Sequence, residues 1–349
     1  MPARVAGVPA LFLIGLCLGL LAAGCGDRTP RPAEYGASDE DVTGIHIARW
    51  HGDRQAAISY TFDDGLPDHG GLAAPLLEQY GFRGTFFICP GLTVETDSAA
   101  AAGAVDARGG TSWECVIDLA SRGHEIGNHS WSHPDLKQCT ETELAFQVTA
   151  SSAEIDRRLG TPPFTFCYPF NKKNHRVRRL VYRHHHAARE YQHDWGGEQF
   201  STQTVRQQLE QAVNTGSWLV PMLHGIEHGY HAFTNRQVLA DHLAEVRRDS
   251  TRFWVDTYGT VARYEIERDE VELHVEQRPT TALLTLVTSL DTTVYNQPLT
   301  VVVPVARGCD VQARRQTSGN PVPVKVRADR ILVDITPGSE PVLVQWQEE

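Results

Sequence analysis

Two neighbouring carboxylates, Asp63 and Asp64, follow a short apolar segment that is typical of a buried strand, and Gly65 comes directly after them. Neighbouring side chains of a strand point to opposite faces of the sheet. A turn at Gly65 would instead allow one carboxylate to bind a cation while the other stays free as a base. The alternative is a solvated Asp-Asp-Gly turn, which is common in proteins of every kind.

Two histidines, His129 and His133, stand four residues apart after another short strand-like segment. At this spacing two imidazoles share one face of a helical turn and can hold one metal ion. The chain has 16 histidines, so chance pairs are expected, and the cluster at 184–186 is typical of a solvated helix face. The pair at 129 and 133 differs because it lies in a strand–helix loop, at the sheet end where Asp64 is expected. One carboxylate and two imidazoles would form an open metal site with a position for water.

A third candidate, His224, ends an apolar segment at 220–223. At the same sheet end it could protonate a leaving group, and the alternative is a surface or hydrogen-bonded core histidine. With Glu227 and His228 it also spells H-x-x-E-H, an inverted zinc-peptidase motif. That motif requires a helix, and the proline before it and the glycines at 225 and 229 argue against one.

The elements that would position these residues alternate between strands and helices. The predicted strands are 56–61, 84–88, 125–127, 164–168, 218–223 and 253–255, and the predicted helices are 72–80, 113–122, 140–159, 177–184, 205–213, 237–246 and 258–264. This alternation indicates a parallel sheet or barrel with both faces covered. From 266 onward the chain is β-rich with frequent turn residues, which predicts a small antiparallel sandwich. The fold class is therefore α/β, a (β/α) barrel followed by a small all-β domain.

The motifs at residues 61–65 (Thr-Phe-Asp-Asp-Gly) and 129–133 (His-Ser-Trp-Ser-His) resemble the first two motifs of the polysaccharide deacetylases of the NodB homology type, carbohydrate esterase family 4. The resemblance runs from about residue 57 to 224 and implies a deformed barrel of the NodB type. It implies that Asp63 is the catalytic base. It also implies a metal triad made of Asp64, His129 and His133.

The later motifs match less completely. The family's third motif aligns with residues 166–171, where Pro169 is kept, Phe170 replaces the tyrosine whose N–H helps to bind the oxyanion, and Cys167 replaces the arginine that orients the base. Arg189 could substitute for that arginine from the next strand end. Asp194 and Trp195 match the fourth motif, in which Asp tunes the acid histidine. Residues 222–224 match the fifth motif and make His224 the general acid. The substrate-binding residues that the resemblance implies are Tyr168, Pro169, Phe170, Trp195 and Met222.

The implied activity is metal-dependent hydrolysis of acetyl groups, chiefly N-acetyl, from a polysaccharide. Zn²⁺ suits two imidazoles and a carboxylate best, while Co²⁺, Ni²⁺ or Fe²⁺ would fit similarly. Two other interpretations remain open: a non-catalytic glycan-binding lipoprotein on a degenerate deacetylase scaffold, and the zinc peptidase described above. The net charge of −11, from 43 acidic and 32 basic residues, argues against a nucleic-acid partner.

The first residues resemble a bacterial lipoprotein signal. Arg4 precedes an apolar run at 11–21, and small residues lead into Cys25. We therefore expect a signal peptide at 1–24, a lipid anchor at Cys25 with a tether at 25–45, the barrel at 46–265 and the sandwich at 266–349. This places the protein outside the cytoplasm, anchored to a membrane in the periplasm or at the cell surface. In an oxidising compartment a disulfide between Cys115 and Cys139 is conceivable, because both flank the same apolar segment.

Overall fold

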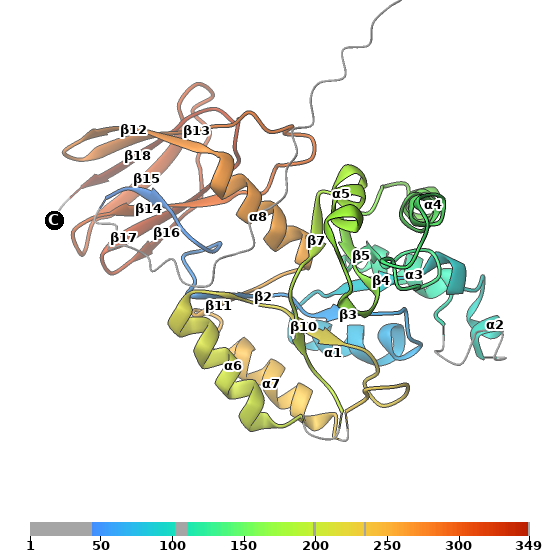
Figure 1. Cartoon of the computed structure of the whole chain (residues 1–349). Coiled ribbons are helices and arrows are strands. Elements are labelled where there is room, and N and C mark those ends of the chain that lie inside the picture. Colours follow the sequence, from blue (N-terminus) through green and yellow to red (C-terminus); the bar gives the residue numbers. More distant parts are fainter. Residues whose placement is uncertain (1–43, 102–109, 198–199, 234, 348–349) are drawn as a thin grey trace, which may run out of the picture.

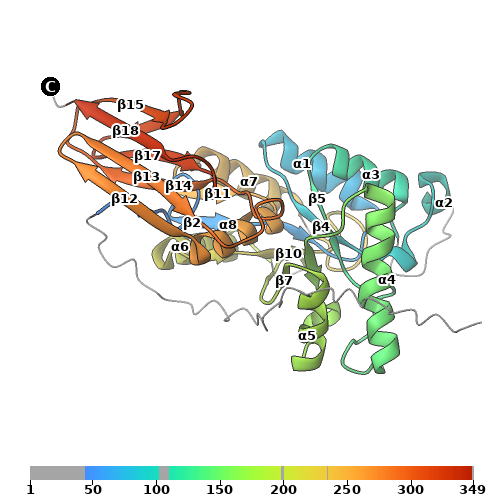
Figure 2. The ribbon, with the colours of Figure 1, turned by 90° about the horizontal axis from the view of Figure 1, so that it is seen from above.

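The computed structural model describes residues 44–101, 110–197, 200–233 and 235–347, which form a parallel α/β part and an antiparallel β part (Figure 1). Figure 2 shows the β part at one end of the molecule and helices α3, α4 and α5 toward the other end. The predicted signal peptide and the anchor at Cys25 lie outside the described residues. Within the described residues, no helix combines the length and the apolar character that crossing a bilayer requires.

The α/β part is built on a curled parallel sheet of seven strands in the order β7-β6-β5-β4-β3-β10-β8. A smaller parallel sheet, β11-β2-β9, continues it, because β2 leads into β3 and β9 into β10 along the chain. The strands are β2 (Ala56–Ile58), β3 (Thr61–Phe62), β4 (Thr85–Ile88), β5 (Glu125–Asn128), β6 (Thr165–Cys167), β7 (Ala187–Arg189), β8 (His193–Asp194), β9 (Trp218–Leu219), β10 (Pro221–Leu223) and β11 (Phe253–Val255). This topology confirms the predicted class, a deformed (β/α) barrel.

Helices connect successive strands and cover the outside of this sheet, as parallel strands require. The helices are α1 (Ala74–Gln79), α2 (Asp97–Ala101), α3 (Trp113–Ser121), α4 (Glu141–Leu159), α5 (His175–His184), α6 (Thr202–Thr215), α7 (Gln237–Arg248) and α8 (Tyr258–Glu270). Single turns occur at His69–Ala73, Pro90–Leu92 and Pro169–Asn171. Helix α4 begins at the capping box of Thr140 and Glu143 and ends at Gly160 in the left-handed conformation, in agreement with the predicted helix at 140–159.

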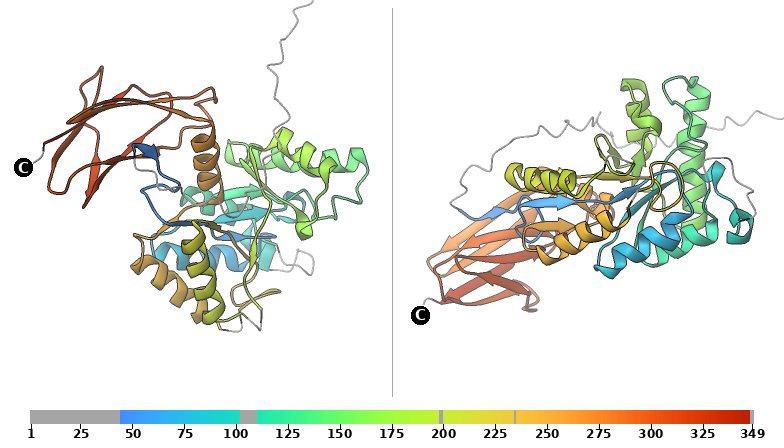
Figure 3. Two further views of the ribbon diagram at one scale, coloured as in Figure 1. Left: turned by 60° about the vertical axis from the view of Figure 1, so that its left-hand side comes forward. Right: turned by 90° about the horizontal axis from the view of Figure 1, so that it is seen from below.

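The β part is the predicted sandwich, made of two four-stranded antiparallel sheets in the orders β1-β14-β17-β16 and β12-β13-β18-β15 (Figure 3). Its strands are β1 (His46–Ile47), β12 (Glu272–Arg278), β13 (Thr281–Val287), β14 (Leu299–Pro304), β15 (Asp310–Arg315), β16 (Val324–Arg327), β17 (Arg330–Ile335) and β18 (Val342–Gln347). Strand β1 precedes the barrel in sequence but pairs with β14. The predicted domain boundary between 265 and 266 falls inside α8, which runs on to Glu270.

Helix α8 joins the two parts through buried contacts. The hydroxyl of Tyr264 donates a hydrogen bond to the carbonyl O of Ala48 at 2.7 Å. Trp50 and Trp254 belong to the same buried cluster as the sandwich side chains Leu284 and Val301. One end of the barrel and the sandwich therefore share one apolar cluster, while a second buried cluster lies within the barrel.

The five described cysteines are all free, so the disulfide considered between Cys115 and Cys139 is not formed. Cys115 lies on α3, and Cys139 lies in the loop that leads into α4. Flanking the same segment of sequence did not bring their sulfur atoms together.

Candidate active site

The two neighbouring carboxylates lie at the carboxyl end of β3, in the turn that the sequence predicts. Asp64 has φ 72° and Gly65 has φ 65°, so the chain takes two successive left-handed residues directly after the strand. Asp64 is not glycine, and this conformation is uncommon for it. Asp63 and Asp64 are only 5% and 6% exposed. Both acids are therefore held inside the barrel end rather than solvated in a surface turn.

Asp64, His129 and His133 come together as one cluster. Asp64 Oδ1 lies 3.3 Å from His129 Nε2 and 3.2 Å from His133 Nε2. One possible ligand atom from each of the three buried residues lies within 4.8 Å of the others. The structure thus assembles the three residues that the sequence proposed as metal ligands.

The prediction of a helical turn for the two histidines is wrong. Residues 129–140 contain no helix, and both Ser130 (φ 70°) and His133 (φ 58°) are left-handed. Two local hydrogen bonds shape the loop: the Ser130 N–H donates to Asn128 Oδ1, and the His133 N–H donates to Ser130 Oγ. These left-handed turns, and not a helical turn, bring the two imidazoles together.

The donor chemistry of the cluster fits a cation. His129 Nδ1 lies 2.8 Å from the carbonyl O of Cys167, which can only accept, so Nδ1 carries the proton and Nε2 presents a lone pair to Asp64. Asp64 Oδ1 is buried and has no hydrogen-bond donor among the described residues. A buried group of acceptors without a donor is costly unless a positive charge sits among them. Burial alone would lower the pKa of His129, but Cys167 and Asp64 raise it well above its ordinary value, so the pocket favours positive charge.

Asp63 is held by Arg189 rather than by the cluster. Arg189 Nη1 donates to Asp63 Oδ1 at 2.8 Å, and Nη2 donates to Asp63 Oδ2 at 2.5 Å. Nη1 also donates to Thr61 Oγ1 at 2.6 Å. Burial would raise the pKa of Asp63, but the charge and hydrogen bonds of Arg189, with His129, lower it far below its ordinary value. Arg189 lies at the end of β7, three strands beyond the neighbour of β3, and reaches Asp63 because the sheet curls.

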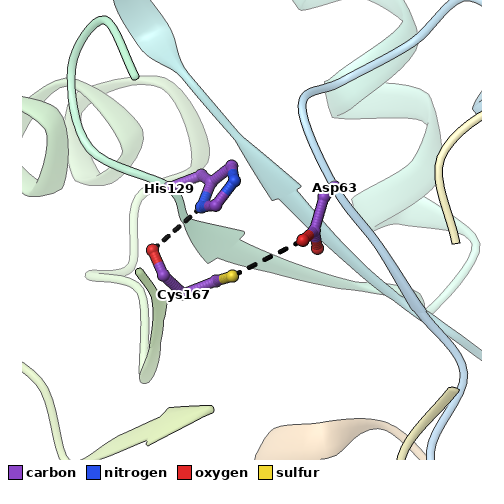
Figure 4. A group of neighbouring side chains, drawn as sticks. All are labelled: Asp63, His129 and Cys167. Atoms are coloured by element: carbon purple, nitrogen blue, oxygen red, sulfur yellow. Dashed lines mark hydrogen bonds between the residues drawn. The ribbon is translucent and has the colours of Figure 1, made fainter. Parts of the chain in front are cut away.

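Cys167 lies beside Asp63 and His129 (Figure 4). Its Sγ lies 3.6 Å from Asp63 Oδ2, and its carbonyl O accepts from His129. Asp63, His129 and Cys167 also offer ligand atoms within 4.8 Å of one another. Burial raises the pKa of the Cys167 thiol, so it is a neutral donor to Asp63 and a poor metal ligand. Of the two groups, Asp64 with the two histidines is therefore the better candidate metal site.

His224 follows β10 and faces the other oxygen of Asp64, with Nε2 3.9 Å from Oδ2. Burial lowers its pKa below the ordinary value. Its Nδ1 is buried without a partner among the described residues. Asp194, which the resemblance implies as the partner of this histidine, is exposed and accepts from Gln192 instead. The structure brings His224 to the site and leaves Asp194 outside it.

The implied substrate-binding residues are divided between the site and the core. Phe170 is 57% exposed, and its ring centroid lies 4.5 Å from that of His133. Pro169 is buried next to it, and Tyr168 is buried with its hydroxyl donating to Glu190. Met222 is buried in β10, where it pairs with Thr61. Trp195 is also buried, and its indole N–H donates to Gln208, so it packs in the core instead of lining an open pocket.

The H-x-x-E-H string at 224–228 forms a turn and not a helix. The backbone N–H groups of Ile226, Glu227 and His228 all donate to Asp68 Oδ2, at 3.0, 2.7 and 2.7 Å. The Glu227 carboxylate pairs with Arg236. The groups of possible metal ligands in the described residues do not include Glu227 or His228. The zinc-peptidase interpretation is therefore not supported.

A cavity of about 690 Å³ lies away from this cluster, between the ends of α3 and α4 and the start of α8. Its lining includes Glu125, whose carboxylate accepts from Thr85, Thr165 and the N–H of Gly259. Because this carboxylate is already hydrogen-bonded to neighbouring protein groups, it is less available to react than the acids at the strand ends. We place the reaction at the acidic turn after β3.

A curled parallel sheet with a carboxylate–histidine cluster at its strand ends defines a deformed (β/α) barrel with a candidate metal centre. A sequence model of the polysaccharide deacetylase family matches residues 52–188. The chain thus carries a polysaccharide deacetylase domain of the NodB homology type (carbohydrate esterase family 4), which confirms the resemblance seen in its motifs.

Curated relatives match parts of the chain. Peptidoglycan-N-acetylglucosamine deacetylase of Bacillus cereus is 31% identical over 111 residues, which are 31% of this chain and 34% of the relative. Peptidoglycan-N-acetylmuramic acid deacetylase PdaC of Bacillus subtilis is 29% identical over 125 residues, 36% of this chain and 23% of the relative. Gellan lyase of a Bacillus species is 24% identical over 340 residues, 85% of this chain and 13% of the lyase. The chain therefore spans about a third or less of the length of these relatives.

Solved structures with a similar arrangement include a family 4 carbohydrate esterase from Bacillus anthracis. It has 18% sequence identity and a TM-score of 0.43, and the match covers 62% of this chain and 86% of the esterase. Peptidoglycan deacetylase PdaC from Bacillus subtilis also has 18% identity, with a TM-score of 0.42 and coverage of 62% and 94%.

Proposed function

We propose that the protein hydrolyses acetyl groups, chiefly N-acetyl, from a polysaccharide outside the cytoplasm. The observation that supports this proposal is that two adjacent acids have different partners and therefore different roles. Asp64 joins two imidazoles in a cluster of acceptors, whereas Asp63 is kept ionised and oriented by Arg189. A protein that only binds glycan needs no such pair.

Asp64, His129 and His133 would hold a divalent cation, which polarises the acetyl carbonyl and makes water more acidic. Asp63 then accepts the proton of the attacking water, because Arg189 fixes its carboxylate and maintains its negative charge. The ring of Phe170 packs on that of His133, so the turn Pro169–Asn171 stands beside the cluster, where the resemblance places an N–H donor for the oxyanion. His224, on the other side of Asp64, donates a proton to the departing amine.

Zn²⁺ is the cation that we propose, because neutral imidazoles and one carboxylate leave an open tetrahedral position. Co²⁺, Ni²⁺ or Fe²⁺ would occupy the same three ligands with similar geometry. The apolar run at 11–21 and the small residues before Cys25 support a lipid anchor at this cysteine and a position outside the cytoplasm.

The rival proposal is a non-catalytic glycan-binding lipoprotein. Its support is the exchange of the motif arginine for Cys167. Against it, Arg189 restores a bidentate contact to Asp63, and His224 is retained beside Asp64. Both features serve proton transfer and add nothing to glycan binding.

The test is acetate release from a panel of N-acetylated oligosaccharides by the full chain, before and after chelation and with Zn²⁺ restored. We expect activity that chelator abolishes and Zn²⁺ recovers. Asp64→Asn should lose both bound metal and activity, whereas Glu227→Gln should keep both, since Glu227 lies outside the cluster. Acetate release that survives chelation, or a fully active Asp64→Asn, would show that the proposal is wrong.

A further inference from the structure

Helix α5 and the turn before it are basic, although the chain as a whole is acidic. The net charge of the sequence is −11, yet no acidic residue occurs between Asp156 and Glu190. Residues 172–183 contain six Lys and Arg side chains, namely Lys172, Lys173, Arg176, Arg178, Arg179 and Arg183. Positive charge is therefore concentrated on this one helix, and the reaction proposed above does not use it.

The outer side of α5 presents a row of basic side chains to solvent. Val177 and Val181 are buried in the apolar cluster that α5 shares with α4 and β6. His175, Arg179 and Arg183 follow one another at intervals of four residues, so they line up along the side opposite the valines. All three are exposed. We call these three residues the basic row, and Figure 2 shows α5 beside α4 at the side of the α/β part.

Acids on neighbouring elements neutralise only part of the charge of α5. Three acids pair with four of the six cations: Glu190 with Lys173 and Arg178, Glu141 with Arg176, and Asp135 with Lys172. Among the described residues, neither Arg179 nor Arg183 has an acidic partner. Six cations against three acids leave a surplus of three positive charges, and two of them belong to the basic row.

The character of this surface fits anionic headgroups and not the apolar interior of a bilayer. A helix that enters the acyl region does so with an exposed apolar face. Within the part of the chain that the structure describes, none of the exposed large apolar side chains lies on α5. Salt screens charges beyond about 8–10 Å, so the acids on distant surfaces do not cancel the local attraction. Each Lys or Arg close to an anionic bilayer strengthens binding about fivefold.

We propose that the basic row of α5 docks on the anionic phospholipid headgroups of a bilayer. The inference rests on the proposed function for one point, the lipid anchor at Cys25 that keeps a bilayer near. The 19 residues from Cys25 to Gly44, where the described chain begins, span at most about 60–70 Å, so the barrel stays within reach of that surface.

Docking through α5 also orients the candidate site. The turn Pro169–Asn171, which stands beside the metal cluster, is separated from the start of α5 by three residues. A helix held on the headgroups therefore keeps the site at a fixed height above the bilayer. The tether alone would leave the barrel free to rotate.

The test is sedimentation of the full chain with vesicles, in the parent variant Cys25→Ser, which cannot receive a lipid. Vesicles of pure phosphatidylcholine are compared with vesicles of equal parts phosphatidylcholine and phosphatidylglycerol. The readout is the ratio of the two partition coefficients, because the apolar run at 11–21 binds both kinds of vesicle alike. The parent should prefer the anionic vesicles, and high salt should remove the preference.

Substitutions then locate the contact. Arg179→Gln with Arg183→Gln should lower the ratio about thirtyfold, about fivefold for each cation. Arg179→Lys with Arg183→Lys keeps the charge and should match the parent. Arg247→Gln with Arg248→Gln is the matched control, because it removes two exposed arginines from α7, which lies apart from α5 (Figures 1 and 2). This control should leave the ratio unchanged.

Acetate release from a soluble N-acetylglucosamine oligomer separates this inference from the proposed function, and the substitutions at 179 and 183 should leave it unchanged. If the parent releases no acetate yet prefers anionic vesicles through Arg179 and Arg183, the function fails and the inference stands. A parent without preference for anionic vesicles overturns the inference, and so does an equal loss in both glutamine double variants. Binding of soluble polyphosphate without binding of anionic vesicles would assign the basic row to a phosphate polymer and also overturn it.

Discussion

Replacing Arg189 by methionine tests the central feature of the site, the arginine that reaches Asp63 from a distant strand. Methionine has a similar length and fills most of the space, but it provides neither the charge nor the two donors that now hold Asp63. Arg189 is 2% exposed and Asp63 is 5% exposed, so water cannot replace those donors. The substitution therefore leaves a buried carboxylate without its partner.

Removal of one partner from a buried ion pair costs about 3–5 kcal/mol of stability. For a domain of 150–250 residues each kcal/mol lowers Tm by about 2–4 °C, so the midpoint should fall by about 6–20 °C at neutral pH. The loss depends on pH. In wild type the pKa of Asp63 is depressed, so the pair stabilises the fold above the ordinary value of 3.8 and is lost as pH falls through the depressed pKa.

In Arg189→Met the contribution of Asp63 to stability changes with pH in the opposite direction. Burial, the largest influence on Asp63, then loses the opposing charge and hydrogen bonds of Arg189, so the pKa of Asp63 rises. The variant loses stability as pH increases from about 4 toward the raised pKa, and the difference from wild type is larger at pH 7 than at pH 4. The acid limb of kcat/KM should move to higher pH by the same cause. Since a positioned general base contributes about 10²–10⁴-fold, kcat should fall by at least 10².

The assays are thermal unfolding at pH 4 and pH 7 and the pH profile of acetate release. Arg189→Lys retains the charge without the planar fork, so it should recover stability better than kcat. Cys167→Ala is the matched control, because it removes a buried neighbour of Asp63 but leaves the ion pair in place. Wild-type Tm and an unshifted acid limb in Arg189→Met would refute the reasoning.

Two further substitutions probe other buried carboxylates. Asp68→Ala removes the acceptor of three backbone N–H groups, so stability should fall by about 1–3 kcal/mol. The turn after His224 should loosen, so kcat, measured by acetate release, should fall as well. A kcat equal to that of wild type would contradict this role of Asp68. Burial raises the pKa of Glu267 to about 7. The buried carboxyl therefore does not lower the stability of the fold below about pH 4.5, and it lowers that stability increasingly as pH rises to 7. Glu267→Gln keeps the acceptor for the N–H of Gln297. In thermal unfolding it should raise stability by about 2 kcal/mol at pH 8 but hardly at pH 4.5. An equal effect at both pH values would contradict the raised pKa of Glu267.

The sequence predicts the centre of the site because that centre follows from strand order. Asp64, His129 and His224 each come directly after a parallel strand, and the carboxyl ends of such strands meet at one edge of the sheet. The local route to the histidine pair was not predictable in the same way. Ser130 and His133 take left-handed conformations that their residue types do not signal.

The sequence suggested Arg189 only as a possible substitute for the missing motif arginine, and the structure places its guanidinium on Asp63. Arg189 lies 126 residues from Asp63, and only the closure of the curled sheet determines which distant strand end meets β3. The prediction that Trp195 binds substrate is not supported by its position. Its position in a motif suggests a pocket, but the ring packs between Tyr60, Phe200 and His242 in the core. Strand β1 has two residues and therefore no periodicity from which its pairing with β14 could be read.

The pairing of β1 with β14 also affects the order in which the chain can fold. The N–H of Gly52, just after β1, donates to Thr300 Oγ1, 248 residues further along the chain. At a synthesis rate of about 5–20 residues per second, the first strand waits about 12–50 s for its partner to leave the ribosome. The beginning of the described chain is thus among the last parts to reach its final place. A chain that stops before β14 therefore leaves the backbone groups of β1 without their partner strand.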